Sequence, residues 1–272
     1  LVGLVNSGIM DLSGTIGVIM GSNIGTTLTA WILSLAGIES DNVFLKLLKP
    51  EAFSPIFAFI GIILVMVSKK AKRRDAGRIM IGFSVLMFGM QLMSNAVSPL
   101  ADMPEFSSML TAFENPILGV VVGTVFTGII QSSAASVGIL QALSLTGSVT
   151  YGMAIPIIMG QNIGTCVTAL LSSIGVNRNA KRVSVIHISF NLIGTIICLV
   201  AFYTVDYFVK FTFVSESITP ITIAFVHSIF NIVTTIILLP FTRQLESLAK
   251  VVIRGDDKKG EVVMLDERLL ST

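Results

Sequence analysis

The chain has 272 residues, of which 53% are hydrophobic and 12% are charged, with a formal net charge of +2. Soluble globular domains carry about a quarter charged residues, so this composition excludes an ordinary soluble domain, and no nucleic-acid partner is expected. A mean hydropathy of +0.87 predicts an all-α, polytopic membrane protein in contact with membrane lipid.

Three apolar stretches begin within the first 97 residues. Leu12–Ile38 and Ile79–Ala101 contain no charged residue, and each is long enough for a bilayer core that takes about 20 residues per helix. Ala52–Ser68 is shorter but sufficient for one crossing. Basic residues mark the cytoplasmic side of short loops, so the cluster from Lys69 to Arg78 predicts that the second and third spans connect inside the cell.

The connection 98–115 carries acidic residues and no Lys or Arg, which predicts an external loop. Basic residues from Arg178 to Arg182, and again after Thr242, predict that these segments and the C-terminus are cytoplasmic, in a protein of the cell membrane. The other expected elements are a hairpin at 116–145, spans at 150–174, 183–206 and 219–241, and a cytoplasmic linker at 243–272.

The hairpin is predicted by counting crossings. The chain runs outward before residue 98 and is back inside at Arg178, so the segment between them crosses an odd number of times. One crossing is 150–174, which leaves 116–145 as two helices or as a re-entrant hairpin. The hairpin is favoured because the polar string QSSAAS at 131–136 divides it into arms of about 14 residues, too short to span. Irregular backbone at that depth is tolerated where it lines a cavity.

A duplicated motif is the strongest single feature. GSNIGTTLTA at Gly21–Ala30 recurs as GQNIGTCVTA at Gly160–Ala169, and IFAFIGII at Ile56–Ile63 echoes SFNLIGTI at Ser189–Ile196. The predicted topology gives the two copies opposite directions, so 1–97 and 116–242 form inverted-topology repeats. Such repeats are typical of secondary transporters, whose substrates and coupling ions bind near the bilayer midplane.

Each GxNIGT string places Gly, Asn and Thr inside an apolar span. Glycine disfavours a continuous helix, so we expect discontinuous helices whose N-termini suit an anion and whose free carbonyls and hydroxyls suit sodium. The alternative is close packing, because small residues are common where membrane helices touch. The presence of two inverted copies favours the binding interpretation.

Gln131, Ser132 and Ser133, followed by Ser136, place an amide and hydroxyls in the middle of a long uncharged stretch, where unpaired polar groups are costly. The alternative is that these hydroxyls bond to helix carbonyls.

Two further strings repeat a His and an Asn four residues apart, on one helix face: His187 with Asn191, and His227 with Asn231. Intramembrane His can relay protons or bind metal. Because neither has an acidic or Cys partner nearby in sequence, we interpret these residues as interior polar groups in interhelical hydrogen bonds.

Together, QSSAAS, the twin GxNIGT strings and the paired HxxFN strings resemble the bacterial type II sodium/phosphate cotransporters over nearly the whole chain. In that family a QSSS string lies at the tip of a hairpin in each inverted repeat, and the resemblance implies that its Gln and Ser groups bind sodium and phosphate. Carried over, the site comprises Gln131, Ser132, Ser133, Ser136, Asn162, Gly164, Thr165, Asn23, Gly25 and Thr26. The sodium ligands among them would be Gln131, Ser132, Ser133, Thr26 and Thr165.

Two departures from the family pattern matter. The third Ser is Ala134 here, for which Ser136 is the expected substitute. The same spacing applied to Asn23 places a first QSSS before residue 1, so we expect the N-terminal repeat to be truncated within its hairpin. At the other end, 243–272 resembles the linker that in many bacterial members leads to a cytoplasmic, helical, regulator-like domain.

The leading hypothesis is a sodium-coupled inorganic phosphate symporter, not an enzyme, with sodium as the coupling ion and no other cofactor. Apart from Asp206 at the very end of the span 183–206, no Asp or Glu lies in a predicted span, which favours sodium over a proton-carrying carboxylate. The alternatives are a sodium-coupled transporter of sulfate or a dicarboxylate, a membrane phosphate sensor, and an intramembrane hydrolase. The hydrolase would use Ser132 or Ser133 as nucleophile and His187 or His227 as base.

Overall fold

The computed structural model describes residues 1–35, 50–97, 99, 103 and 112–255. Within these residues the regular elements are helices, and the β-structure is a single isolated bridge between Thr150 and Ser217. Five described helices are long and apolar enough to cross a membrane: Leu12–Ser34, Ala71–Ala96, Tyr151–Ser172, Arg178–Val209 and Pro220–Val252. The prediction of an all-α, multi-pass membrane protein is therefore confirmed. Most of the predicted external loop, and the tail 256–272, lie outside the described residues.

The described residues of the first repeat form a short helix and three long ones: α1 (Val2–Asn6), α2 (Leu12–Ser34), α4 (Pro50–Val67) and α5 (Ala71–Val97). The basic cluster expected in a loop between the last two is mostly helical, because α5 already begins at Ala71 and the intervening loop is only 68–70. Lys, Arg and Ala are good helix formers, which accounts for the early start.

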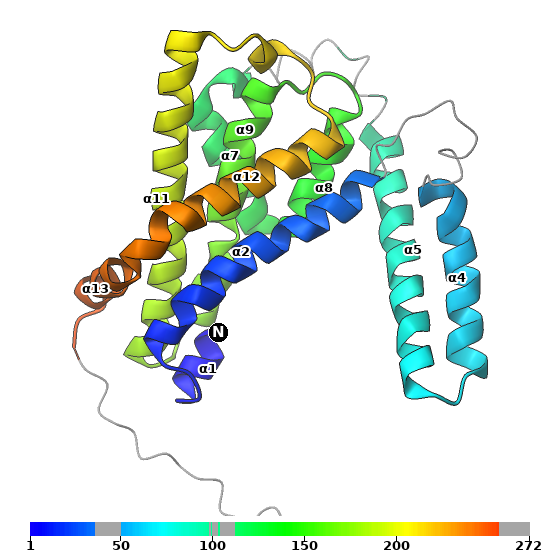
Figure 1. Cartoon of the computed structure of the whole chain (residues 1–272), viewed down its shortest axis with the longest axis horizontal. Coiled ribbons are helices and arrows are strands. Elements are labelled where there is room, and N and C mark those ends of the chain that lie inside the picture. The colour runs from blue at the N-terminus through cyan, green and yellow to red at the C-terminus, as the bar shows by residue number, and fades with distance from the viewer. Residues whose placement is uncertain (36–49, 98, 100–102, 104–111, 256–272) are drawn as a thin grey trace, which may run out of the picture.

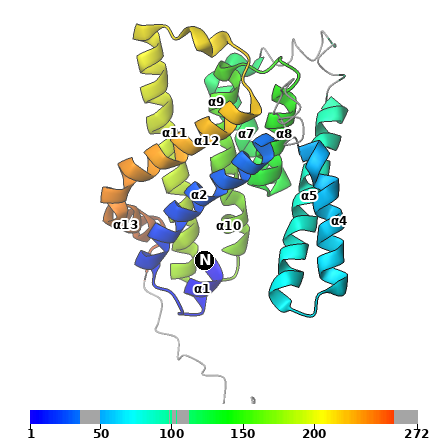
Figure 2. The same cartoon turned by 45° about the vertical axis from the view of Figure 1, so that its right-hand side comes forward.

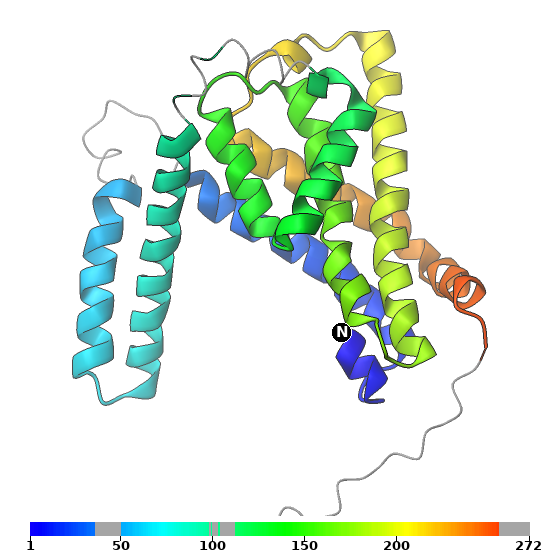
Figure 3. The same cartoon turned by 180° about the vertical axis from the view of Figure 1, so that it is seen from behind.

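The second repeat begins with two short helices, α7 (Pro116–Ile130) and α8 (Ser133–Ser144). The side chain of Asn115 accepts hydrogen bonds from the N–H groups of Ile117 and Leu118, and with Pro116 it fixes the start of α7. At 1.5 Å per residue α7 is about 22 Å long and α8 about 18 Å, both less than the apolar core of a bilayer. Figure 3 shows the two helices meeting inside the bundle.

The helices that follow are α9 (Tyr151–Gly164), α10 (Cys166–Ser172), α11 (Arg178–Val209) and α12 (Pro220–Leu238). The predicted linker then starts as a helix, α13 (Thr242–Val252), after the short turn η5 (Leu239–Phe241). Leu245 and Ala249 lie four residues apart on the buried face of α13, in the same apolar cluster as residues of α11. This amphipathic spacing explains why a charged stretch forms a packed helix here.

Hydrogen bonds show which helix ends lie together. Asn6, at the end of α1, accepts from the backbone N–H of Asn177 at 2.9 Å, just before α11. At the opposite end of the bundle, Gln141 Nε2 of α8 donates to the carbonyls of Ala30 in α2 (2.9 Å) and Pro220 in α12 (3.0 Å). α2 therefore runs from the Asn177 end to the Pro220 end, whereas α9 and α10 run the other way (Figures 1 and 2). The two GxNIGT strings thus point in opposite directions.

The hairpin of α4 and α5 lies at one side of the molecule (Figure 1). Gly61 and Gly77 bring its two backbones together, since a Cβ on Gly61 would lie 2.7 Å from the Gly77 carbonyl oxygen. The attachment to the rest of the bundle is mainly through α5, where Met90 packs with Leu33 of α2. Gly61 has its repeat counterpart in Gly194, which packs equally closely on Thr234 of α12.

Candidate functional site

The break between α7 and α8 falls within the polar string, at Gln131 and Ser132. Gln131 has φ +57°, in the left-handed region, and its N–H donates to the Thr127 carbonyl at 2.7 Å. Ser132 caps α8, because its Oγ accepts from the N–H of Ala135 at 3.2 Å. The carbonyl end of α7 and the N–H end of α8 therefore meet at this tip, which places partial negative and partial positive charge side by side.

The hairpin is braced by buried polar contacts behind its tip. The hydroxyls of Thr127 and Ser136 lie 2.7 Å apart and join the two arms. Gln161 of α9 donates through Nε2 to the Ser136 carbonyl at 3.0 Å. Ser136, expected as a substitute ligand, is fully buried and already has a partner inside the hairpin. The tip itself keeps the exposed Gln131 and the half-buried Ser132 and Ser133.

The second GxNIGT string lies beside the hairpin tip. Gly164 packs on the last turns of α7, where a Cβ would lie 2.5 Å from the Thr124 carbonyl oxygen and 3.1 Å from the Gly128 nitrogen. Directly after it, Thr165 separates α9 from α10, and its hydroxyl donates to the Gln161 carbonyl at 2.9 Å. The interruption in this copy is therefore one residue long, and its glycines make a helix contact, as the close-packing alternative expects.

Interhelical polar contacts continue from this string into α11 and α12. Asn162 is 4% exposed, and its Oδ1 lies 3.4 Å from His227 Nε2 of α12. Asn191 of α11 donates through Nδ2 to Cys166 Sγ of α10 at 3.3 Å. Asn231 donates to the His227 carbonyl one turn earlier in its own helix, at 2.9 Å.

Several acceptors in this buried region have no hydrogen-bond partner among the described residues. They include Gln161 Oε1, Asn191 Oδ1 and Asn231 Oδ1, together with His227 Nδ1. Buried acceptors are normally bonded, so these neutral oxygens retain the capacity to bind a water molecule or a cation.

The first GxNIGT string behaves differently. α2 continues through Gly21–Ala30 without a break, so the discontinuous helix expected in this copy is absent. Asn23 Nδ2 donates to the Ile19 carbonyl at 3.0 Å and Thr26 Oγ1 to the Ser22 carbonyl at 2.9 Å, which ties both side chains to their own helix. Gly25 is exposed, and a Cβ on it would meet nothing within 4 Å. With no close neighbour in the described structure, nothing displaces the helix here.

The structure thus brings only part of the predicted site together. The last turns of α7, directly before Gln131, pack on Gly164, which Thr165 follows in sequence, and Asn162 connects to the interior residue His227. Within the part of the chain that the structure describes, no hydrogen bond joins Asn23 or Thr26 to the hairpin tip. His187 does not join the polar contacts of His227; its side chain lines a cavity of about 280 Å³ between the repeats, together with Ile19, Thr168 and Ser172.

Two buried amides were missed by the sequence interpretation. Gln161 braces the hairpin, but it occupies the position where the first copy has Ser22, so a comparison limited to identical residues passes over it. Gln141 joins the ends of α2, α8 and α12, and its only sequence signal is a lone amide in an apolar run.

The hydrolase alternative finds no support in this geometry. Ser132 Oγ is used as the cap of α8, and the Nε2 atom of His227 is directed to Asn162. No hydrogen bond links Ser132 or Ser133 to His187 or His227 within the described segments.

The motifs lie in segments of the chain that match a known protein family. The sequence model of the Na+/Pi-cotransporter family matches residues 1–95 and 85–226. The chain is 26% identical over 257 residues to "Uncharacterized protein YqeW" of Bacillus subtilis, an alignment that covers 93% of the chain and 77% of YqeW.

It is 24% identical over 250 residues to "Putative inorganic phosphate export protein YjbB" of Escherichia coli, covering 91% of the chain and 43% of YjbB. A third similar protein is "Sodium-dependent phosphate transport protein 2B" of Homo sapiens, at 34% identity over 101 residues, covering 35% of the chain and 15% of that protein. The chain thus spans less than half the length of the latter two. No solved structure matches it significantly.

Proposed function

Because the chain belongs to the Na+/Pi-cotransporter family, we propose that it forms the membrane core of a sodium-coupled inorganic phosphate symporter. The family is one of transporters rather than of enzymes. The observation that carries the proposal is the tip at Gln131–Ser133, where two short helices meet directly after the turns of α7 that pack on Gly164.

Phosphate is assigned to the N-terminal end of α8. The first N–H groups of a helix lack intrahelical partners and carry partial positive charge, which makes them a general anion-binding element. The hydroxyls of Ser132 and Ser133 lie at this end and supply further donors. The Ala at position 134 removes one hydroxyl from the pattern, and the buried pairing of Ser136 leaves the anion with two.

Sodium is assigned to neutral oxygens around the same tip. The last carbonyls of α7 carry partial negative charge, and the amide of Gln131 and the hydroxyl of Thr165 are the neighbouring neutral groups that we assign to sodium with them. The amide oxygens of Asn191 and Asn231, which have no partner among the described residues, are further candidate sodium ligands deeper in the bundle. In the proposed full site, Asn23, Gly25 and Thr26 contribute the corresponding groups from the first copy.

Coupling follows from the proximity of the two ligands. A cation at the carbonyl end of α7 favours an anion at the N–H end of α8, and the anion must strengthen sodium binding by the same factor. The antiparallel course of α2 and α9 supplies the inverted repeats that alternate access in secondary transporters. In the proposed orientation the C-terminus is cytoplasmic.

Uptake of radiolabelled phosphate by the full-length protein in proteoliposomes tests this function. Phosphate is expected to accumulate when external sodium is present and to remain at the background level when choline replaces sodium. Equal uptake in choline would contradict the proposal. Sulfate and dicarboxylates, added in excess, distinguish the other oxyanion transporters, because they are expected not to compete.

A matched pair of variants assigns the uptake to the hairpin tip. Ser133→Ala is expected to reduce uptake about tenfold or more, since one hydrogen bond to a charged ligand contributes about 1.5–3 kcal/mol. Ser148→Ala, in the loop between α8 and α9, serves as the control and is expected to leave uptake unchanged.

Phosphate export is the second candidate function, because the similar protein YjbB is named a phosphate export protein. The same site would serve transport in either direction, since the sodium gradient and the relative affinities on the two sides set net flux. Proteoliposomes preloaded with phosphate and free of sodium on both sides distinguish the two: an exporter that is independent of sodium releases phosphate, whereas a sodium symporter does not.

A further inference from the structure

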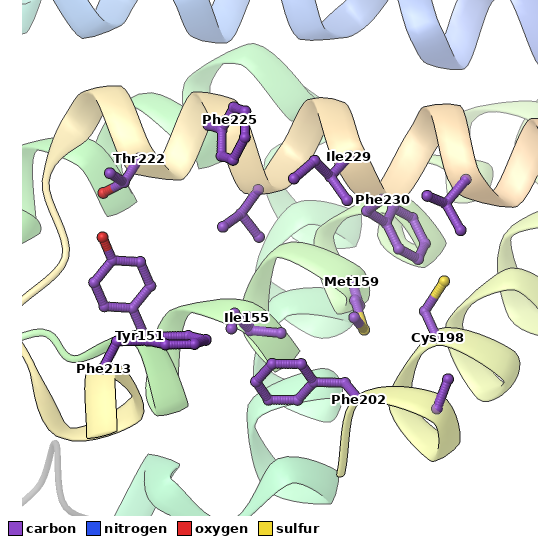
Figure 4. A pocket seen from close by; sticks show the side chains of 13 residues that line it. Tyr151, Ile155, Met159, Cys198, Phe202, Phe213, Thr222, Phe225, Ile229 and Phe230 are labelled. Carbon is purple, nitrogen blue, oxygen red and sulfur yellow. The ribbon is translucent and has the colours of Figure 1, made fainter. Parts of the chain in front are cut away.

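A second cavity, of about 550 Å³, lies between α9, α11 and α12. Its volume is within the range of about 300–1,000 Å³ that small-molecule sites occupy. The lining is almost entirely apolar and includes Ile155, Met159, Phe202, Phe225, Ile229 and Phe230 (Figure 4). None of these residues belongs to the proposed phosphate and sodium site.

The cavity has one polar end and one apolar end. Oxygen-bearing side chains among its lining are those of Tyr151 and Thr222, at the first turns of α9 and α12, and Figure 4 shows their hydroxyls directed toward one another. From there the cavity runs along both helices to Met159 and Val233. The side chains that line this part carry only hydrocarbon and sulfur groups. Such a gradient matches an amphiphile whose polar part stays at the helix ends and whose chain extends into the bundle.

The cavity also opens toward the surface that the spans present to the bilayer. All three lining helices belong to segments long and apolar enough to cross a membrane. On α12, Phe225 is 54% exposed, Ile229 45% and Val233 37%. Hydrocarbon chains are therefore the molecules that surround this opening, and an empty apolar cavity beside them would forfeit its dispersion contacts.

Charges near the polar end carry both signs. Lys210 and Asp206 adjoin Phe211, whose ring lies 5.1 Å from that of Phe213 in the cavity wall. Glu216 lies on the other side, where its carbonyl accepts from the Tyr151 N–H at 3.1 Å. A mixed set of charges gives no preference for an anionic headgroup over a zwitterionic one.

We propose that this cavity is a binding site for one acyl chain of a membrane phospholipid, selected by its chain and not by its headgroup. Its ester region would lie at Tyr151 and Thr222, and its chain would pack between Phe202 and Phe230. The deep end of the cavity is at Met159, one turn before Asn162, so the occupant lies next to the interior polar contacts of α9 and α12.

The test uses the full-length protein in vesicles that contain phosphatidylcholine with a photoactivatable diazirine near the end of one acyl chain. After irradiation, mass spectrometry locates the lipid adducts. Adducts are expected to be several-fold enriched on peptides that contain Met159, Phe202 or Phe230 over peptides from exposed spans such as α4. Phosphatidylglycerol with the same chain is expected to give the same pattern and yield.

Two variants that introduce the same large side chain at neighbouring positions sharpen the test. Ala201→Trp fills the cavity and is expected to reduce these adducts several-fold. Val200→Trp adds the same side chain at a neighbouring position that is 63% exposed and does not line the cavity, and is expected to leave them unchanged. Size-exclusion profiles confirm that both variants remain folded.

Three results would overturn the proposal. An even spread of adducts over all exposed spans in the unmodified protein would show ordinary lipid contact only. Crosslinks between two copies through Ile229→Cys would show that protein covers the opening. A strong preference for phosphatidylglycerol would show that the headgroup selects the lipid.

Discussion

Gly164 of α9 and Thr124 of α7 lie so close that a Cβ on the glycine would be 2.5 Å from the threonine carbonyl oxygen. This contact places the second GxNIGT string against the hairpin whose tip carries Gln131, Ser132 and Ser133. Its counterpart in the first string, Gly25, has open space around it. Equivalent residues of one repeated motif thus have different surroundings in the described structure.

Alanine substitution should therefore separate the two copies. Gly164→Ala in the 272-residue chain is expected to lower the free energy of unfolding by about 1–3 kcal/mol, because the added methyl meets backbone that cannot move aside. Gly25→Ala is expected to be neutral or stabilising, since Ala is favoured over Gly in a helix by about 0.8–1.0 kcal/mol. Unfolding in mixed micelles, followed by the fluorescence of Trp31, measures both. Equal destabilisation by the two variants would contradict the contact.

Gln141 is expected to stabilise the junction of α2, α8 and α12 through its two carbonyl partners. Gln141→Leu should cost about 1–2 kcal/mol of unfolding free energy, in line with the modest strength of hydrogen bonds between membrane helices. Gln91→Leu is the control, because the bond that Gln91 makes among the described residues is to Asn95 on its own helix. If the Gln91 variant loses as much stability, the bonds from Gln141 do not hold the junction.

A substitution at Asn231 tests whether its side-chain amide stabilises the fold or binds an ion. Its Oδ1 is buried without a partner among the described residues, and its Nδ2 bonds to a carbonyl of its own helix. Asn231→Leu, which keeps the number and branching of the side-chain heavy atoms, should therefore change stability by less than about 1 kcal/mol. If this oxygen contributes to sodium binding, the same variant needs a higher sodium concentration for half-maximal phosphate uptake. Measuring unfolding and sodium titration on one preparation separates the two effects; a large loss of stability with unchanged sodium dependence would assign Asn231 to packing.

Arg182 anchors the C-terminal end of α13. It is 5% exposed and donates from Nη2 to the carbonyls of Ile253 at 2.9 Å and Gly255 at 2.6 Å. Hydrogen bonds from a charged group contribute about 1.5–3 kcal/mol each, and those from Arg182 hold residues 253–255 against the bundle. Arg182→Gln should therefore raise the rate of trypsin cleavage after Arg254 about tenfold or more. Lys181→Gln changes an exposed neighbour by the same charge and should leave the cleavage rate at its original value. The rates are measured in detergent by mass spectrometry.

The long helices and the break between α7 and α8 could be predicted from the sequence. Hydropathy identifies the spans, and a polar string flanked by apolar arms too short to cross a bilayer indicates a helix, a break and a helix. Asn115 and Pro116 likewise mark a helix start through local chemistry alone.

The surroundings of the repeated glycines could not be predicted in this way. Gly21 and Gly160 have nearly identical neighbours in sequence, yet only Gly160 meets another helix in the described structure. Whether a glycine breaks a helix, packs against one or remains open depends on what tertiary structure brings to it. The packed helix at the start of the predicted linker, α13, could not be predicted for a related reason, because its buried face shows only in the spacing of Leu245 and Ala249.

The central claim is that the tip of the α7–α8 hairpin binds sodium and phosphate together. Ala134→Cys, introduced into the full-length protein with Cys198 and any Cys outside these 272 residues replaced by Ala, places a thiol within the first turn of α8, while Cys166 is only 2% exposed. The rate at which a maleimide modifies this thiol is measured with sodium, with phosphate and with both. Sodium and phosphate together should slow the modification strongly, and phosphate with choline should not. A rate that neither ligand changes, alone or together, would contradict the account.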